Sequence, residues 1–140
     1  MRFLLDTNVL SESAKREPNQ HVLTWLNQAP QSELCVSVLS LGEIYRGIEA
    51  LPQSSKRKSE LTTWMQEVLL PWFGDRIFPV NLPVAQLWGE LQKRCPRTIP
   101  AIDLLIAATA LQHKLHVVTR NARDFQDIPD IVVVNPWVPL

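Results

Sequence analysis

The chain has 140 residues and carries 14 basic and 14 acidic side chains, so its formal net charge at pH 7 is zero. Hydrophobic residues make up 46% and charged residues 20%, which excludes a disordered chain, and no apolar run approaches the roughly 20 residues of a membrane helix. A chain of this length usually folds as one unit, so we expect a single domain over residues 1–140.

Five short apolar segments are predicted to be β-strands. In chain order they are residues 2–5, 34–38, 76–80, 116–119 and 131–134. Pro79 makes the third an edge strand or the end of a strand, because proline cannot donate to a central ladder. The strands are almost continuously apolar rather than alternating, which is typical of a sheet covered on both faces.

Helices are predicted between these strands, over residues 20–27, 41–51, 56–70, 84–94 and 104–113. The longest has one apolar stripe that ends or kinks at Pro71, and Pro83 suits the first turn of the fourth. The fifth is apolar on most faces, so we expect it to be the central buried helix. Strands that alternate with helices predict a parallel sheet of α/β type.

Four acidic residues stand out by their positions relative to these elements. Asp6 follows the first strand, Glu43 lies in the first turn of the helix after the second, and Asp124 follows the fourth. Asp103 opens the buried helix, which leads back into a strand. All four should therefore lie at the carboxyl edge of a parallel sheet, where open α/β sheets place their ligand sites.

Converging carboxylates repel one another unless they are protonated or bind a cation. An all-oxygen set favours Mg²⁺ or Mn²⁺ over zinc. Such a cluster can activate a water molecule and stabilise charge on a phosphate, which is typical of phosphodiester hydrolysis.

Each acid also has an ordinary structural interpretation. Asp6 can end a strand through an Asx turn, and Glu43 stands three residues after Ser40, which is the spacing of a capping box. Asp103 can cap the buried helix, and Asp124 can be a solvated turn residue. The metal-site hypothesis therefore depends on all four falling at one edge.

Neighbouring polar residues fall into two sets. Hydroxyl and amide groups that can orient carboxylates or metal-bound water, or simply stabilise turns, come from Thr7, Asn8, Thr119 and Asn121. Bases in loops at the same edge, which either contact a phosphate backbone or balance the acids, are Arg97, Arg120 and Arg123.

The two cysteines, Cys35 and Cys95, have no metal-binding or redox spacing. Cys35 lies in an apolar run, where a thiol acts as a small hydrophobe, and Asp6 comes too early for a signal peptide. We therefore expect free thiols and a cytoplasmic protein.

Four segments together carry a resemblance to a known family. They are residues 6–12 (DTNVLSE), Gly42-Glu43, residues 102–110 (IDLLIAATA) and residues 119–125 (TRNARDF). In this order and spacing they resemble the PIN-domain family, and more closely the VapC toxins of VapBC toxin–antitoxin pairs and their FitB-like relatives. The resemblance runs from Arg2 to about Pro136.

This resemblance implies a three-layer α/β/α sandwich with a central, mostly parallel sheet of about five strands, and a ribonuclease that depends on Mg²⁺ or Mn²⁺. The acidic quartet of the family falls on Asp6, Glu43, Asp103 and Asp124. The hydroxyl and amide residues of its last motif fall on Thr119 and Asn121. It further implies a homodimer that cleaves RNA, is held inactive by a small antitoxin, and reaches operator DNA only through that antitoxin.

Three alternatives remain open. The first is a phosphatase. Phosphatases with an aspartyl nucleophile usually have an Asp-x-Asp motif after the first strand, and the Asp6-Thr7-Asn8 of this chain departs from it. The second is a metal-dependent DNA nuclease, and the third is a non-catalytic module that acts only by binding its antitoxin or operator DNA. The tryptophans belong to the core or to a dimer or antitoxin groove, where Trp is enriched: Trp25, Trp64, Trp72, Trp88 and Trp137.

Overall fold

The computed structural model describes residues 1–139 and contains one five-stranded sheet in the order β3-β2-β1-β4-β5. Every neighbouring pair of strands is parallel. The strands are β1 (Phe3–Leu5), β2 (Leu34–Ser37), β3 (Ile77–Phe78), β4 (His116–Val118) and β5 (Val133–Val134). The predicted parallel sheet and the edge position of the third strand are thus confirmed, although each strand is shorter than expected.

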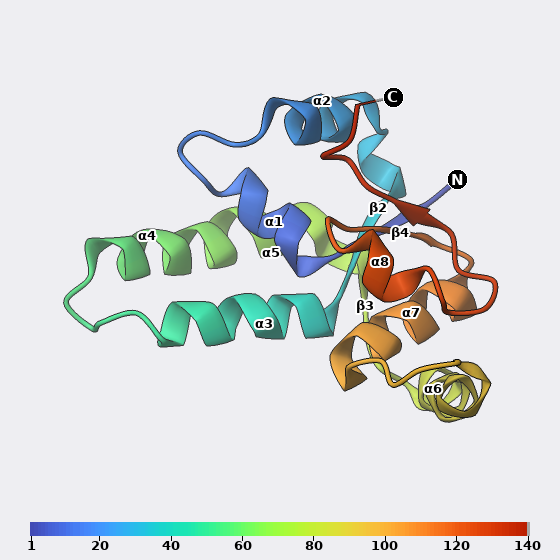
Figure 1. Cartoon of the computed structure of the whole chain (residues 1–140). Coiled ribbons are helices and arrows are strands. Elements are labelled where there is room, and N and C mark those ends of the chain that lie inside the picture. Colours follow the sequence, from blue (N-terminus) through green and yellow to red (C-terminus); the bar gives the residue numbers. More distant parts are fainter. Residues whose placement is uncertain (140) are drawn as a thin grey trace.

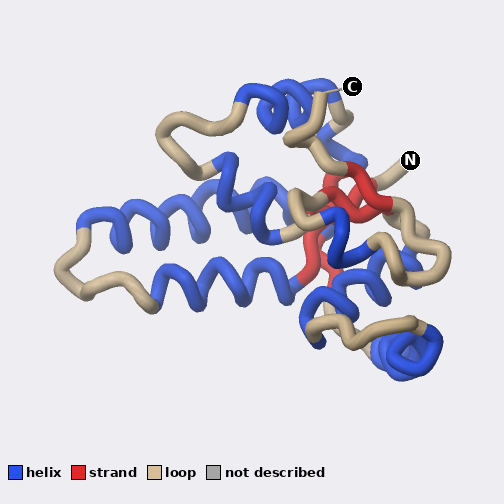
Figure 2. The backbone as a smooth tube through the Cα atoms, viewed as in Figure 1, coloured by secondary structure: helices blue, strands red, loops and turns tan. Residues whose placement is uncertain are grey.

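Helices cover both faces of this sheet (Figures 1 and 2). One layer contains α1 (Thr7–Ser13), α2 (Gln20–Gln28), α3 (Val38–Glu49), α4 (Lys56–Trp64) and α5 (Leu70–Phe73). The other contains α6 (Leu82–Arg94), α7 (Ala101–His113) and the short α8 (Ala122–Phe125). The predicted α/β/α sandwich is confirmed.

The pleat of the strands separates two hydrophobic cores. Leu4 pairs with Cys35 and Val117, and all three pack against α6 and α7. The next residue, Leu5, pairs with Val36 and Val118 on the opposite face, where α1 to α5 pack. Successive strand residues point to opposite faces, so an apolar residue at each position gives the sheet a core on both sides.

The helix at α7 is the buried helix that the sequence predicts. Its residues from Leu104 to Ala110 are nearly all buried, including Thr109, whose hydroxyl donates to Leu105 O at 2.8 Å. Pro83 lies in the first turn of α6 as expected, with Asn81 as the N-cap.

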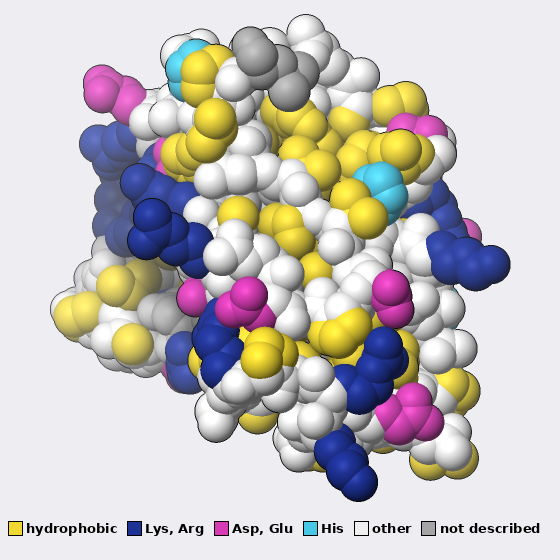
Figure 3. All heavy atoms as spheres, turned by 45° about the vertical axis from the view of Figure 1, so that its right-hand side comes forward, with side chains coloured by type: hydrophobic (Ala, Val, Ile, Leu, Met, Phe, Trp, Pro, Cys, Tyr) yellow, Lys and Arg dark blue, Asp and Glu magenta, His cyan; other side chains and the backbone are white. Residues whose placement is uncertain are grey.

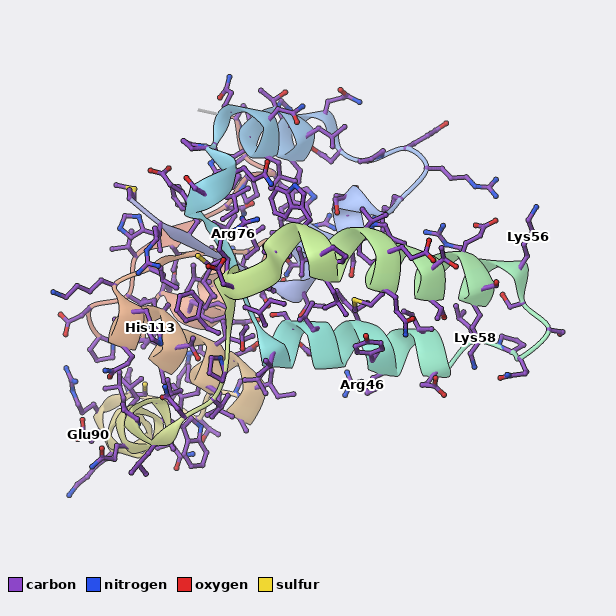
Figure 4. All side chains as sticks on the ribbon, turned by 180° about the vertical axis from the view of Figure 1, so that it is seen from behind. Arg46, Lys56, Lys58, Arg76, Glu90 and His113 are labelled. Carbon is purple, nitrogen blue, oxygen red and sulfur yellow. The ribbon has the colours of Figure 1, made fainter. Side chains whose placement is uncertain are left out.

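The helical run after residue 56 extends beyond residue 70, although the sequence predicts that it ends or kinks at Pro71. Pro71 does not end it: a π-helical turn, Met65–Leu69, separates α4 from α5, and the run continues to Phe73. The main-chain N–H of Leu70 donates to Met65 O, five residues back. A proline lacks an N–H and its ring crowds the preceding turn, and a π-helical turn accommodates such a break in the ladder. Figure 4 shows this run lying antiparallel to α3.

Cys35 and Cys95 are both free, as predicted. None of the helices within residues 1–139 combines the length and the apolar character needed to cross a bilayer.

Candidate active site

Asp6 lies between β1 and α1, at the carboxyl edge of the sheet. It is the N-cap of α1, a helix of seven residues that was not predicted from the sequence. Its Oδ1 accepts from the Thr7 main-chain N–H at 2.8 Å, and its Oδ2 accepts from the Thr119 hydroxyl at 2.8 Å. These bonds fix a carboxylate that is only 5% exposed.

Thr119 connects the end of β4 to this carboxylate. Its hydroxyl donates to Asp6 and accepts from Asn8 Nδ2 at 3.2 Å and from the Asn121 main-chain N–H at 3.0 Å. A hydroxyl has one proton and two lone pairs, so these contacts use its full capacity. Asn8 Oδ1 in turn accepts from the Arg120 main-chain N–H at 3.1 Å. Asn121 contributes its backbone here, while its side chain is exposed.

Glu43 reaches the site from the second turn of α3. The Thr7 hydroxyl donates to its Oε1 at 2.6 Å, which links α3 to α1. The capping-box interpretation is wrong, because α3 begins at Val38 and its N-cap is Ser37, whose hydroxyl oxygen accepts from Leu39 N at 3.1 Å. Ser40 is instead buried inside the helix.

Asp103 lies on the third residue of α7 and not at its cap. The N-cap is Pro100, which offers no side-chain acceptor, so the interpretation of Asp103 as a capping residue is wrong. Burial, followed by the nearby carboxylates of Asp6, Asp124 and Glu43 in that order, raises the pKa of Asp103 to about 6. A carboxyl group near these charges ionises less readily than one in water.

Asp124 lies on α8, a helix in a segment that was predicted to be a polar turn. This four-residue helix is anchored by Phe125, whose side chain is fully buried. Asp124 also acts on Asp6: burial raises the pKa of Asp6, the hydrogen bonds from Thr119 and Thr7 oppose that rise, and the charges of Glu43 and Asp124 add to it. The fold thus brings all four acids close enough to influence one another.

These acids do not form a tight cluster. Within residues 1–139, no three His, Cys, Asp or Glu side chains are arranged so that they could hold a metal ion together. The donor set nevertheless fits Mg²⁺, which is usually held by one or two carboxylates and keeps several of its water ligands. Asp6 is already oriented by its hydrogen bonds, and Asp103 has its charge disfavoured by its neighbours.

The three predicted arginines have different surroundings. Arg120 lies over the Trp137 ring, with its guanidinium carbon 5.4 Å from the ring centroid, and Arg123 is exposed on α8. Both line a shallow hollow with Asn121, Asp124 and Asn135. Arg97 instead forms an ion pair with Asp127 and contacts the main chain of α8.

A fifth carboxylate near this edge was given no role from the sequence. Glu12, at the end of α1, is 5% exposed and accepts from Lys15 Nζ at 3.0 Å and from the Asn19 main-chain N–H at 2.9 Å. These hydrogen bonds lower the pKa of Glu12. They also hold the loop between α1 and α2, a contact that no spacing in the sequence indicates.

The parallel sheet with carboxylates at its carboxyl edge defines the class of protein. The PIN domain family model matches residues 3–131, and the chain belongs to this family. It is similar to Toxin FitB of Neisseria gonorrhoeae, with 37% identity over 96% of this chain and 98% of that protein.

Two further relatives extend the comparison. VapC ribonuclease Y4jK of Sinorhizobium fredii is 32% identical over 98% of this chain and 99% of its own length. The solved structure of FitAB bound to an IR36 DNA fragment contains a similar chain, with a TM-score of 0.90 and 35% identity, covering 99% of this chain and 97% of that one.

Proposed function

We propose that this protein is the endoribonuclease toxin of a type II toxin–antitoxin system and that it hydrolyses RNA phosphodiesters with the help of Mg²⁺ or Mn²⁺. The observation that carries this proposal is the mutual influence of four carboxylates at one sheet edge, where burial and three neighbouring acids raise the pKa of Asp103 to about 6. Membership of the PIN domain family and similarity to a VapC ribonuclease support the choice of RNA as substrate.

In this proposal Asp6 and Asp103 hold the principal cation, and Glu43 and Asp124 complete the site and position water. A bound divalent ion would stabilise charge on the phosphate and make a water molecule more nucleophilic. The chain itself supplies orientation. Thr119 and the Thr7 N–H fix the Asp6 carboxylate, while the Thr7 hydroxyl fixes Glu43.

Hydrolysis requires an oxygen of water to bond to phosphorus while the ester oxygen leaves. Arg120 and Arg123 line the hollow beside Asp124, and we propose that they contact phosphates of the RNA backbone. Their positive charges would keep the polyanion near an acidic site that otherwise repels it.

We also propose that a small antitoxin neutralises this protein, that operator DNA is reached only through the antitoxin, and that the toxin is a homodimer. The similarity to a FitAB complex that binds DNA supports the first two points. Two cores that share one sheet support a single domain over residues 1–140. Free thiols and an RNA substrate support a cytoplasmic location.

The proposal is tested by cleavage of labelled RNA with Mg²⁺, with Mn²⁺ and with EDTA, using wild type and Asp6→Asn. We expect EDTA to stop cleavage and Asp6→Asn to reduce it more than about a hundredfold, because changes around metal ligands alone cost 10–100-fold. Asp75→Asn is the matched control: it removes an exposed carboxylate that precedes β3, at the opposite edge of the sheet.

Cleavage that survives both the chelator and Asp6→Asn would refute this mechanism. Faster cleavage of single-stranded DNA of the same sequence would favour the DNA nuclease, and release of phosphate from small phosphoesters would favour the phosphatase. Tight antitoxin binding without Mn²⁺ binding or cleavage would favour the non-catalytic module.

A further inference from the structure

Arg97 makes three hydrogen bonds that all end on the segment carrying Asp124. Its Nε donates to Asp127 Oδ2 at 2.8 Å, and its Nη2 donates to Arg123 O at 3.0 Å and to Asp124 O at 3.2 Å. Arg97 itself belongs to the loop between α6 and α7. One side chain thus connects the loop before α7 to α8.

The two carbonyl groups belong to the last turn of α8. A helix leaves its final carbonyl groups without intrahelical partners, and a helix of four residues has few other bonds to hold it. Within the part of the chain described here, no main-chain N–H donates to Arg123 O or Asp124 O. The Arg97 guanidinium supplies the missing donors, and its charge suits the negative end of the helix.

The connection links the loop before α7 to α8, and each of these two helices carries one of the four acids of the proposed site. Asp103 is on the third residue of α7, shortly after the Arg97 loop, and Asp124 is on α8. We propose that Arg97 is a positioning residue that sets where the Asp124 carboxylate lies relative to Asp103, and so determines how tightly the site holds its divalent cation. This inference rests on the proposed function, because it assigns a role within that same site.

The surroundings of Arg97 distinguish this positioning role from that of a stabilising ion pair and from that of an RNA contact. The side chains of Arg97 and Asp127 are each 41% exposed, and an ion pair this exposed adds little to the free energy of unfolding. The contacts to α8 also orient the guanidinium toward protein carbonyl groups, whereas a residue that only binds RNA would direct it to phosphate. Metal affinity is therefore the property that Arg97 should change most.

The test uses the full-length protein and measures the Mn²⁺ dissociation constant by calorimetry and by electron paramagnetic resonance. Arg97→Ala should weaken Mn²⁺ binding about tenfold, because partners that orient metal ligands typically contribute 10–100-fold. The KM for RNA should change less than twofold, while the Mn²⁺ concentration for half-maximal cleavage rises with the dissociation constant. Asp127→Asn should weaken Mn²⁺ binding in the same direction but less, because it keeps the two carbonyl contacts.

A matched control comes from the neighbouring pair. Arg94 Nη2 lies 3.5 Å from Asp130 Oδ2 and also connects the end of α6 to the segment after α8, without contacting the α8 carbonyl groups. Arg94→Ala should leave Mn²⁺ binding unchanged. Arg97→Lys keeps the charge but not the planar donor geometry, so we expect its Mn²⁺ affinity to lie between those of wild type and Arg97→Ala.

A positioning role and an RNA contact predict different results for the Arg97 variants. If Arg97→Ala raises the KM for RNA and leaves Mn²⁺ binding at the wild-type value, Arg97 is an RNA contact and the inference is wrong. If Arg97→Ala does not fold, Arg97→Lys and Asp127→Asn decide, and unchanged Mn²⁺ affinity in both overturns it. Failure of Asp6→Asn to affect cleavage would instead count against the proposed function itself.

Discussion

In the metal-free protein, the fold disfavours the ionised form of the Asp103 carboxyl group. Burial and three carboxylates raise its pKa to about 6 from an ordinary value of 3.8. Between these two pKa values the native state keeps the Asp103 proton that the unfolded state has lost. The contribution of Asp103 to the free energy of unfolding therefore falls as pH rises from about 4 to about 6, and it stays low above that. Without metal, Asp103 opposes folding at neutral pH.

Asp103→Asn should therefore stabilise the metal-free protein near neutral pH while it abolishes cleavage. We expect a gain of about 1 kcal/mol, less than the full shift implies, because solvent reaches Asp103 and screens its neighbours. The measurement is urea unfolding with EDTA at about pH 7.5 and about pH 4, where the difference should vanish. In Mg²⁺ the order should reverse, because binding stabilises only the wild type.

Asp75→Asn serves again as control, since its exposed carboxylate should change stability by less than about 0.5 kcal/mol at either pH. If the Asp103→Asn protein is less stable than wild type at neutral pH without metal, the other acids do not disfavour the charge of Asp103 in the wild type.

The positions of the site residues follow from the sequence further than their contacts do. Because parallel strands share a carboxyl edge, the elements alone place Asp6, Glu43 and Asp124 near one another. The hydrogen bonds that orient them come partly from main-chain N–H groups, such as those of Thr7 and Asn121. Any residue but proline carries an N–H, so residue types in the sequence give no sign of this role.

At the scale of elements, Arg76 joins three segments at the edge of the sheet. Its guanidinium donates to Leu34 O at 2.7 Å, at the start of β2, and also to Gln31 O and to Trp72 O in α5. It lies over the Trp72 ring with its guanidinium carbon 4.5 Å from the centroid. Figure 4 shows Arg76 where α5 meets the strands.

Arg76→Ala should therefore destabilise the protein by about 2 kcal/mol, because three carbonyl groups lose the guanidinium donor and a cation–π contact is removed. Of the three, Gln31 O keeps a second donor, the main-chain N–H of Leu34. The measurement is urea or thermal unfolding of the metal-free protein. Arg46→Ala is the control: Arg46 is exposed on α3 and lies away from the sheet in Figure 4, so it should cost less than about 0.5 kcal/mol. Equal effects of the two variants would refute this role for Arg76.

The types of the major elements could be predicted, but several of their boundaries could not. Periodicity locates α2 and α6, because each has one apolar face that packs against the rest of the protein, whereas α7 is located by an almost continuous apolar run. Periodicity fails at α1 and α8, which have seven and four residues and are too short for a helical period to emerge. At α3 both Ser37 and Ser40 suit an N-cap, and the choice of Ser37 depends on where β2 ends.

At the scale of the whole molecule, the parallel sheet and its two covered faces follow from the apolar strands and the helices between them. Which tryptophans meet a partner does not follow. Trp72 is 38% exposed, whereas Trp25, Trp64, Trp88 and Trp137 are partly buried beside the cores. A residue at the margin of a core and a residue in an interface can have the same sequence pattern, so these assignments stay predictions.

The zero net charge of the chain conceals an uneven distribution. With four of its 14 acids at the candidate site, the rest of the chain carries 14 bases against ten acids. On the face in Figure 3, Lys and Arg side chains gather along one side, and acidic and basic side chains are interspersed lower down. A bound divalent ion would offset the negative charge of the site. RNA would then approach a protein whose remaining surface is mildly basic.

RNA affinity should therefore fall with salt, but only modestly. If Arg120 and Arg123 each contact one phosphate, the logarithm of the association constant should fall with that of the salt concentration with a slope of about −1.4, since each contact on a single strand contributes about −0.7. The measurement is fluorescence anisotropy of labelled RNA with the Asp6→Asn protein at constant Mg²⁺. Arg123→Ala should reduce the slope to about −0.7, whereas Arg2→Ala, before β1 at the opposite edge, should leave it unchanged. An affinity independent of salt would exclude these phosphate contacts, because the release of counterions is what they require.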